Sequence, residues 1–224
     1  MLLDAIRGGS MLSIIVGLAA SAFVIFCTLP IHEFAHAFVA HKLGDNTAKF
    51  RGRMTLNPMA HIDPFGAIMI ALVGFGWAKP VPIDERNFKN RRPGVALTSL
   101  AGPVSNILMA TIMLFFIQFL FLISPELSNN LVLAIYLFLK FAAEINVMLA
   151  VFNLLPIPPL DGYNVLSVLL PNHIYYKIMQ YEQMIMFGIM ILLFTGLLSR
   201  PLGILSNMLF NLLVKLTSLP FLAF

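Results

Sequence analysis

Long apolar runs separated by short polar loops dominate the chain, and they predict helices that cross a membrane. A helix needs about 20 mostly apolar residues to cross a hydrocarbon core about 30 Å thick. Five runs approach or exceed that length, at residues 13–40, 94–123, 131–154, 183–199 and 202–219. We therefore expect an all-α polytopic membrane protein with about five to six transmembrane helices.

A further apolar stretch, at residues 65–77, contains three glycines and is too short to cross as a helix. Irregular backbone at membrane depth is tolerated only where protein or water covers it. We expect a re-entrant or hairpin segment near residues 65–83. A short helix is expected over residues 163–170, before Pro171.

The composition supports a membrane location for the whole chain. Of the 224 residues, 59% are hydrophobic and 11% are charged, and the mean hydropathy is +0.90. A soluble domain carries about 25% charged residues. We expect one integral-membrane domain over residues 1–224, with its core at about 13–170 and C-terminal helices at about 183–219.

The amino-terminal run also has features of a cleaved signal peptide. Arg7 precedes an apolar stretch that leads to small residues at 20–22, as such peptides require. The apolar run nevertheless continues to Val39. Because cleavage would leave a remainder too short to span the bilayer comfortably, we favour a membrane helix.

The basic residues predict an orientation. Nine Lys and Arg residues lie between the first two spans, whereas the loop at residues 124–130 has none and carries Glu126. The positive-inside rule then makes the long loop cytoplasmic and puts the amino terminus outside a plasma membrane. We attribute the net charge of +4 to this orientation, and we expect no binding of nucleic acid.

The sequence His32-Glu33-Phe34-Ala35-His36 stands at the cytoplasmic end of the first span. Residues four apart on a helix lie about 40° apart around the axis, so both imidazoles can bind one ion. Glu33 projects beside the ion, where a general base would deprotonate a water. Ionisable groups within a membrane helix cost about 2.5–3.5 kcal/mol each, and a divalent cation would offset that cost.

A catalytic zinc ion has three protein ligands and one open position. Few acids qualify as the third ligand, because Asp4, Glu126 and Glu144 are predicted to lie far from the cytoplasmic end of the first span. Asp161 is the best candidate. The prolines of residues 156–159 hold a stiff, extended path that can turn its carboxylate back towards them. The alternative is that Asp161 caps a helix beginning near Tyr163. Because the two histidines alone leave the metal site without its third ligand, we favour the role of Asp161 as a metal ligand.

Five motifs now stand in one order along the chain. They are His32-Glu33-x-x-His36, GRMTLNPMAHIDP at 52–64, GWAKPVP at 76–82, AGPVSN at 101–106 and NLLPIPPLDG at 153–162. Together they resemble the site-2 protease family of intramembrane zinc metalloproteases, in its compact form without a PDZ or CBS domain. The resemblance covers about residues 22–170.

The resemblance implies one Zn²⁺ ion bound by His32, His36 and Asp161, with Glu33 as the general base. It implies that Asn153 helps to bind the substrate or the oxyanion. It also implies regulated intramembrane proteolysis of a single-span membrane protein or a signal-peptide remnant in the lipid bilayer. The oligomeric state stays open.

Two further polar residues in these motifs have weaker roles. For His61 we favour a structural or substrate-proximal hydrogen bond. For Asn106 we favour a helix-packing hydrogen bond, with a role at the active site as the alternative. An exposed edge within residues 71–83 would pair with an extended substrate by strand addition, or the stretch would merely plug the cavity.

Other functions compete with proteolysis of membrane proteins. A zinc hydrolase for a lipid or a small amide would use the same metal site. A metal transporter would use the two histidines and Asp161, but transporters often have inverted repeats and ionisable residues in several helices, and neither is visible. An inactive scaffold is disfavoured because every expected catalytic residue is present.

Overall fold

The computed structural model describes residues 10–73, 77–127, 129–166 and 168–221. Within these ranges the regular structure is helical, and Ile62 and Ala78 form an isolated antiparallel β-bridge. Four helical segments there are long and apolar enough to cross a membrane, at residues 11–42, 91–123, 130–153 and 199–221. The expectation of an all-α polytopic membrane protein is confirmed.

The first membrane helix is continuous, although it contains a proline. It consists of α2 (Met11–Phe23), a π-helical turn (Val24–Thr28) and α3 (Leu29–Lys42). The π turn ends two residues before Pro30, whose ring and missing N–H disturb regular α-helical bonding. The wider turn accommodates this proline, and the helix continues into the segment with the two histidines.

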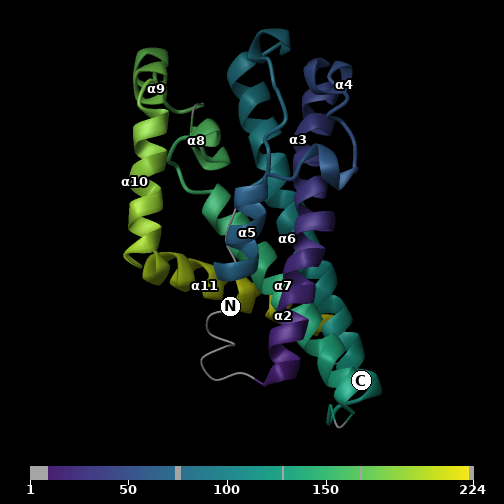
Figure 1. Ribbon diagram of the computed structural model, residues 1–224. Coiled ribbons are helices and arrows are strands. Elements are labelled where there is room, and N and C mark those ends of the chain that lie inside the picture. The colour runs from purple at the N-terminus through teal and green to yellow at the C-terminus, as the bar shows by residue number, and fades with distance from the viewer. Residues whose placement is uncertain (1–9, 74–76, 128, 167, 222–224) are drawn as a thin grey trace.

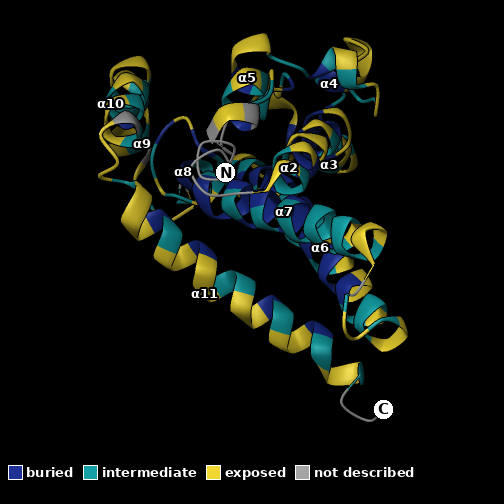
Figure 2. Cartoon of the chain, turned by 60° about the horizontal axis from the view of Figure 1, so that its bottom comes forward, coloured by how far each residue is buried: buried dark blue, intermediate teal, exposed yellow. Residues whose placement is uncertain are grey.

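Helices α6 (Arg91–Ile123) and α7 (Asn130–Asn153) form the centre of the bundle. Ala110, Ala142 and Ala143 are fully buried, and such small side chains allow membrane helices to approach closely. Helix α3 packs against α6, and α2 packs against α7 (Figure 1). Figure 2 shows that buried positions concentrate on this central pair.

The stretch predicted as a re-entrant or hairpin segment does fold back, but its first arm is a helix, α5 (Pro64–Val73). A helix satisfies its own backbone, which suits an apolar stretch at membrane depth. The second arm, residues 77–83, is called the extended segment because its prolines favour extended backbone. A Cβ at Gly66 would overlap the Trp77 carbonyl, so glycine lets the arms touch. The stretch's other two glycines lie outside the described residues.

Four more helices follow the central pair. They are α8 (Asp161–Leu166), α9 (Asn172–Met179), α10 (Glu182–Phe194) and α11 (Ser199–Ser218), and the short α4 (Thr47–Phe50) lies earlier in the long loop. Helices α9 and α10 stand to one side of the bundle, with α8 between them and the central pair (Figure 1). Helix α8 is the short helix expected before Pro171.

The span predicted at residues 183–199 is shorter than expected. Helix α10 has 13 residues, which rise about 20 Å and fall short of a hydrocarbon core about 30 Å thick. Gly196 follows it with a φ of 76°, a left-handed conformation that commonly ends helices. The described residues therefore contain four helices of spanning length, not five to six.

Candidate active site

Helix α3 brings His32 and His36 together on one face, one helical turn apart. Both side chains are buried, and their Nε2 atoms lie 3.0 Å apart. The rings meet edge to face, with centroids 4.6 Å apart. The spacing of four residues therefore produces the converging pair of nitrogens that the sequence predicted.

The second nitrogen of each imidazole has its own partner on α6. His32 Nδ1 lies 3.1 Å from Asn106 Oδ1, and His36 Nδ1 lies 2.7 Å from the carbonyl oxygen of Thr98. Both partners are acceptors, so each Nδ1 carries the proton and donates it. The Nε2 lone pairs are then free to bind a metal ion, an arrangement that is usual for metal-ligating histidines.

Asp161 completes the group from the first turn of α8. Its Oδ2 lies 3.5 Å from His32 Nε2 and 3.3 Å from His36 Nε2. A Cβ at Gly162 would overlap the Leu154 backbone, so glycine lets α8 begin directly against the end of α7.

The three donors suit a zinc ion. Two imidazoles and one carboxylate are common zinc ligands, and ligands about 2.0–2.2 Å from a tetrahedral ion lie about 3.3–3.6 Å from one another. The separations between His32, His36 and Asp161 are 3.0, 3.3 and 3.5 Å. Among the described residues, this is the group of His, Cys, Asp or Glu close enough to share one ion.

Gly102 makes room for the imidazoles between α3 and α6. A Cβ at this position would overlap His36 Nε2 and His32 Nε2. The glycine therefore lets α6 approach the two rings, and the sequence Ala101-Gly102-Pro103 acquires a structural reason. The Asn106 side chain one turn later is fully buried and reaches the first ring.

Glu33 is buried beside the imidazoles and is held by the extended segment. Its Oε2 accepts a hydrogen bond of 2.9 Å from the backbone N–H of Val81. This contact joins residues 48 positions apart, and no pattern in the sequence indicated it. The carboxylate is thereby oriented in the cavity before any substrate enters.

The extended segment is itself tied down at three other points. The Lys79 N–H donates to the His61 carbonyl at 2.7 Å, and Arg53 Nη2 donates to the Lys79 carbonyl at 2.7 Å. Just after the segment, the Asp84 N–H donates to Asp45 Oδ2 at 2.8 Å. These bonds satisfy an irregular backbone that would otherwise be costly at membrane depth.

A cavity of about 420 Å³ opens beside the histidines. Its walls come from α3, the extended segment, the end of α7, the start of α8 and the start of α10. The lining includes Glu33, Asp161 and Asn153, together with Glu182 and Met186 from α10. The metal-binding group and a substrate-sized space therefore belong to one site.

The structure separates the three polar residues with weaker predicted roles. Asn153 lines the cavity, but its Nδ2 donates to the Leu149 carbonyl at 2.9 Å within its own helix. His61 is fully buried outside the cavity lining, with Nε2 2.8 Å from the Thr55 carbonyl. Asn106 contacts the His32 imidazole and does not line the cavity.

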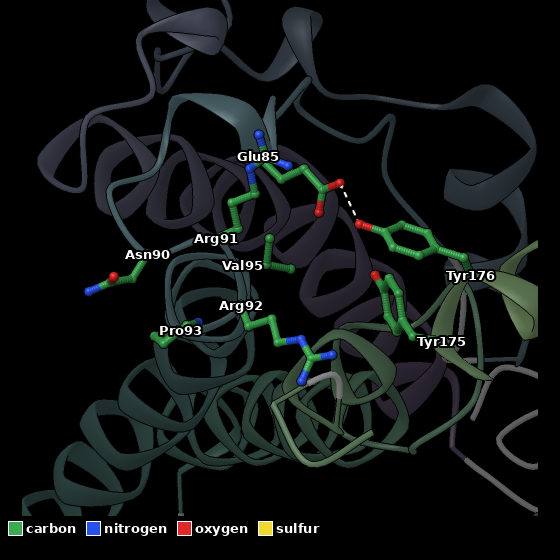
Figure 3. Close-up of a pocket in the computed structure, with 8 residues that line it drawn as sticks. All are labelled: Glu85, Asn90, Arg91, Arg92, Pro93, Val95, Tyr175 and Tyr176. Atoms are coloured by element: carbon green, nitrogen blue, oxygen red, sulfur yellow. Dashed lines mark hydrogen bonds between the residues drawn. The ribbon is translucent and has the colours of Figure 1, made fainter. Parts of the chain in front are cut away.

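A second cavity, of about 360 Å³, lies between the start of α6 and α9 (Figure 3). The Tyr176 hydroxyl donates to Glu85 Oε1 at 2.9 Å across it. Beside it, burial and the nearby Glu85 carboxylate raise the pKa of Tyr175 to about 12. The contact fastens α9 to the loop before α6, and so helps to hold α10 beside the main cavity.

The comparisons with known proteins agree with this geometry. The sequence profile of peptidase family M50 matches residues 20–197. The chain belongs to peptidase family M50. This membership confirms the predicted relationship to site-2 proteases and makes the chain a metalloprotease embedded in a membrane. No solved structure gives a significant match.

Relatives of this M50 chain occur in several bacteria. YwhC of Bacillus subtilis, provisionally named a zinc metalloprotease, is 41% identical over 80% of this chain and 80% of its own length. Rip2 of Mycolicibacterium smegmatis, named in the same way, is 30% identical over 73% of this chain and 61% of its own length. Rip2 of Mycobacterium tuberculosis is 33% identical over 62% and 53%. Such names imply zinc at the site formed by the two histidines and Asp161.

Asn106→Leu is expected to weaken zinc binding by about 10–100-fold, because His32 loses the acceptor that orients its ring. Competition with a chromophoric chelator measures the affinity. Asn106→Asp is the matched control, because it keeps a hydrogen-bond acceptor of similar size. Its zinc affinity should exceed that of the leucine variant by about the same 10–100-fold. Equal affinities for the leucine variant and the wild type would contradict the role.

Gly102→Ala is expected to lower the zinc content of the purified protein sharply, because its methyl group displaces both imidazoles. Gly203→Ala on α11 is the control, since a Cβ there meets nothing within 4 Å. Metal analysis and circular dichroism would be read together. Full zinc occupancy in the Gly102 variant would refute the steric argument.

Proposed function

We propose that this M50 chain hydrolyses peptide bonds of membrane-spanning substrates, with its active site towards the cytoplasm. The observation that carries the proposal is the placement of the His32, His36 and Asp161 donors. They converge in a cavity bounded by helices of membrane-spanning length and by a tethered extended segment. The nine basic residues of the long loop support the cytoplasmic orientation.

His32, His36 and Asp161 would hold one zinc ion through Nε2, Nε2 and a carboxylate oxygen. When bound, zinc supplies a Lewis acid that polarises the scissile carbonyl and lowers the pKa of a coordinated water. The partners on α6 keep both imidazoles in the tautomer that this binding needs. The fourth side of the group is left to the cavity.

Glu33 would act as the general base. It takes a proton from the attacking water and delivers it to the leaving amine. The Val81 N–H holds one carboxylate oxygen, Oε2, at 2.9 Å, which leaves the other oxygen for proton transfer. Asn153 lies in the same lining, and its amide would reach the substrate or the oxyanion after release from the Leu149 carbonyl.

The extended segment would pair with a substrate that is locally unwound. The N–H groups of Lys79 and Val81 are already bonded inward, and Pro80 and Pro82 have no N–H. The carbonyl oxygens of Lys79 and Pro80 accept Arg53 Nη2 at 2.7 and 3.2 Å. The segment therefore offers a neighbouring strand mainly the carbonyl oxygens of its other residues. The substrate's own N–H groups, freed by unwinding, are the donors that such an edge accepts.

Glu33→Gln should keep zinc and lower the cleavage rate by about 10²–10⁴-fold, the usual contribution of general acid–base catalysis. The assay is cleavage of a panel of single-span fusion proteins in detergent, with and without a zinc chelator. Glu126→Gln, in the loop away from the cavity, is the matched control. If Glu33→Gln still cleaves at the wild-type rate, Glu33 is not the general base. A metal transporter would also tolerate Glu33→Gln.

Val81→Pro should lower kcat by about tenfold at unchanged zinc content, because it removes one hydrogen bond to a charged group. Val81→Ala keeps the N–H while trimming the side chain, and it should stay near the wild type. Turnover of the same fusion protein by the two variants gives the comparison. Equal kcat values would show that the N–H does not position Glu33.

A further inference from the structure

Glu182 brings a third carboxylate into the active-site cavity. It is the first residue of α10 and lines the same space as Glu33 and Asp161. Helix α10 stands to the other side of the bundle from α3 (Figure 1), and both helices contribute residues to the cavity lining. The start of a helix is a place that favours a carboxylate side chain.

The other two carboxylates of the cavity already have partners. Glu33 accepts the Val81 N–H, and Asp161 contacts both imidazoles. Among the described residues, Glu182 has neither a hydrogen bond nor an ion pair, and the cavity lining includes no Lys or Arg. The negative charge of Glu182 is therefore available to a charged group of a substrate that enters the cavity.

The balance of charge in the cavity then depends on Glu182. A divalent ion at the His32, His36 and Asp161 group is neutralised by the charges of Asp161 and Glu33. The remaining negative charge is that of Glu182. A positive group on a substrate would offset it, whereas an acidic group would add to it.

Helix α10 also presents its cavity-facing residues in a definite order. Met186 lies one turn after Glu182 and lines the same cavity. The wall is therefore charged at the α9 end of α10 and apolar one turn further along. A membrane segment whose cytoplasmic end is basic and whose next turn is apolar matches this order, and membrane segments carry such basic ends by the positive-inside rule.

We propose that Glu182 selects substrates with a Lys or Arg close to the scissile bond. The inference rests on the proposed function and adds a feature of the substrate to it. An ion pair in a partly hydrated cavity changes a preference by about five-fold. Glu182 acts in this account on specificity and not on the chemical step.

The test uses the purified full chain and a single-span fusion protein that it cleaves in detergent. Each position within four residues of the cleavage site is replaced in turn by Lys, Gln or Glu. The wild type should show a kcat/KM about five-fold higher for Lys than for Glu at one or more positions. Glu182→Gln should bring that ratio close to one, and Glu182→Lys should invert it, both at unchanged zinc content.

Gln183→Lys is the matched control, because it raises the net charge by one unit, as Glu182→Gln does, one residue later and outside the cavity lining. It should keep the wild-type preference. A Lys-to-Glu ratio that is the same in the wild type and in Glu182→Lys at every position would overturn the inference alone. Failure of the zinc-loaded wild type to cleave any fusion protein would overturn the proposed function and this inference with it.

Discussion

Two imidazoles and one carboxylate lie buried among apolar helices, a second carboxylate lies half-buried beside them, and each must find a partner there. An ionisable group without one is costly at membrane depth. The partners of His32, Glu33 and His36 come from α6 and the extended segment, and Asp161 comes from α8. Because these elements are far apart in sequence, satisfying the four groups also determines how the elements are arranged around the cavity.

This constraint explains where the chain uses unusual backbone. Gly102 and Gly162 stand where a Cβ would overlap an imidazole or the end of α7. The extended segment is an irregular stretch that reaches the site, and Arg53 and Asp45 bond the backbone of the segment and of Asp84 just after it from the loop side. Such bonds are required because lipid offers none. The two glycines and the irregular backbone of the extended segment therefore allow the site to assemble.

The sequence predicted most of the spans and the convergence of the two histidines, because both follow from helix geometry and apolar length. It also proposed Asp161, through the stiffness of the prolines before it. The Thr98 carbonyl and the Val81 N–H could not be predicted, since every residue has such groups and only the fold decides which one is near. The length of α10 was overestimated because Gly196 ends the helix within an apolar run. The first arm of the predicted hairpin is the helix α5, because a helix satisfies its own backbone without a neighbouring strand.

The extended segment connects Glu33, the proposed general base, with the unwinding that cleavage of a membrane helix requires. A peptide bond within a membrane helix is protected because its carbonyl and N–H are bonded inside the segment, and unwinding exposes both. In the proposed reaction, the segment's carbonyl oxygens accept the freed N–H groups while the Val81 N–H already orients Glu33. Pairing of the substrate with the extended segment therefore lowers the free-energy cost of unwinding the substrate helix next to Glu33. In a helix at the same position, the carbonyl oxygens would already accept N–H groups of that helix and could not pair with a substrate. This is a physical reason for irregular backbone at this depth.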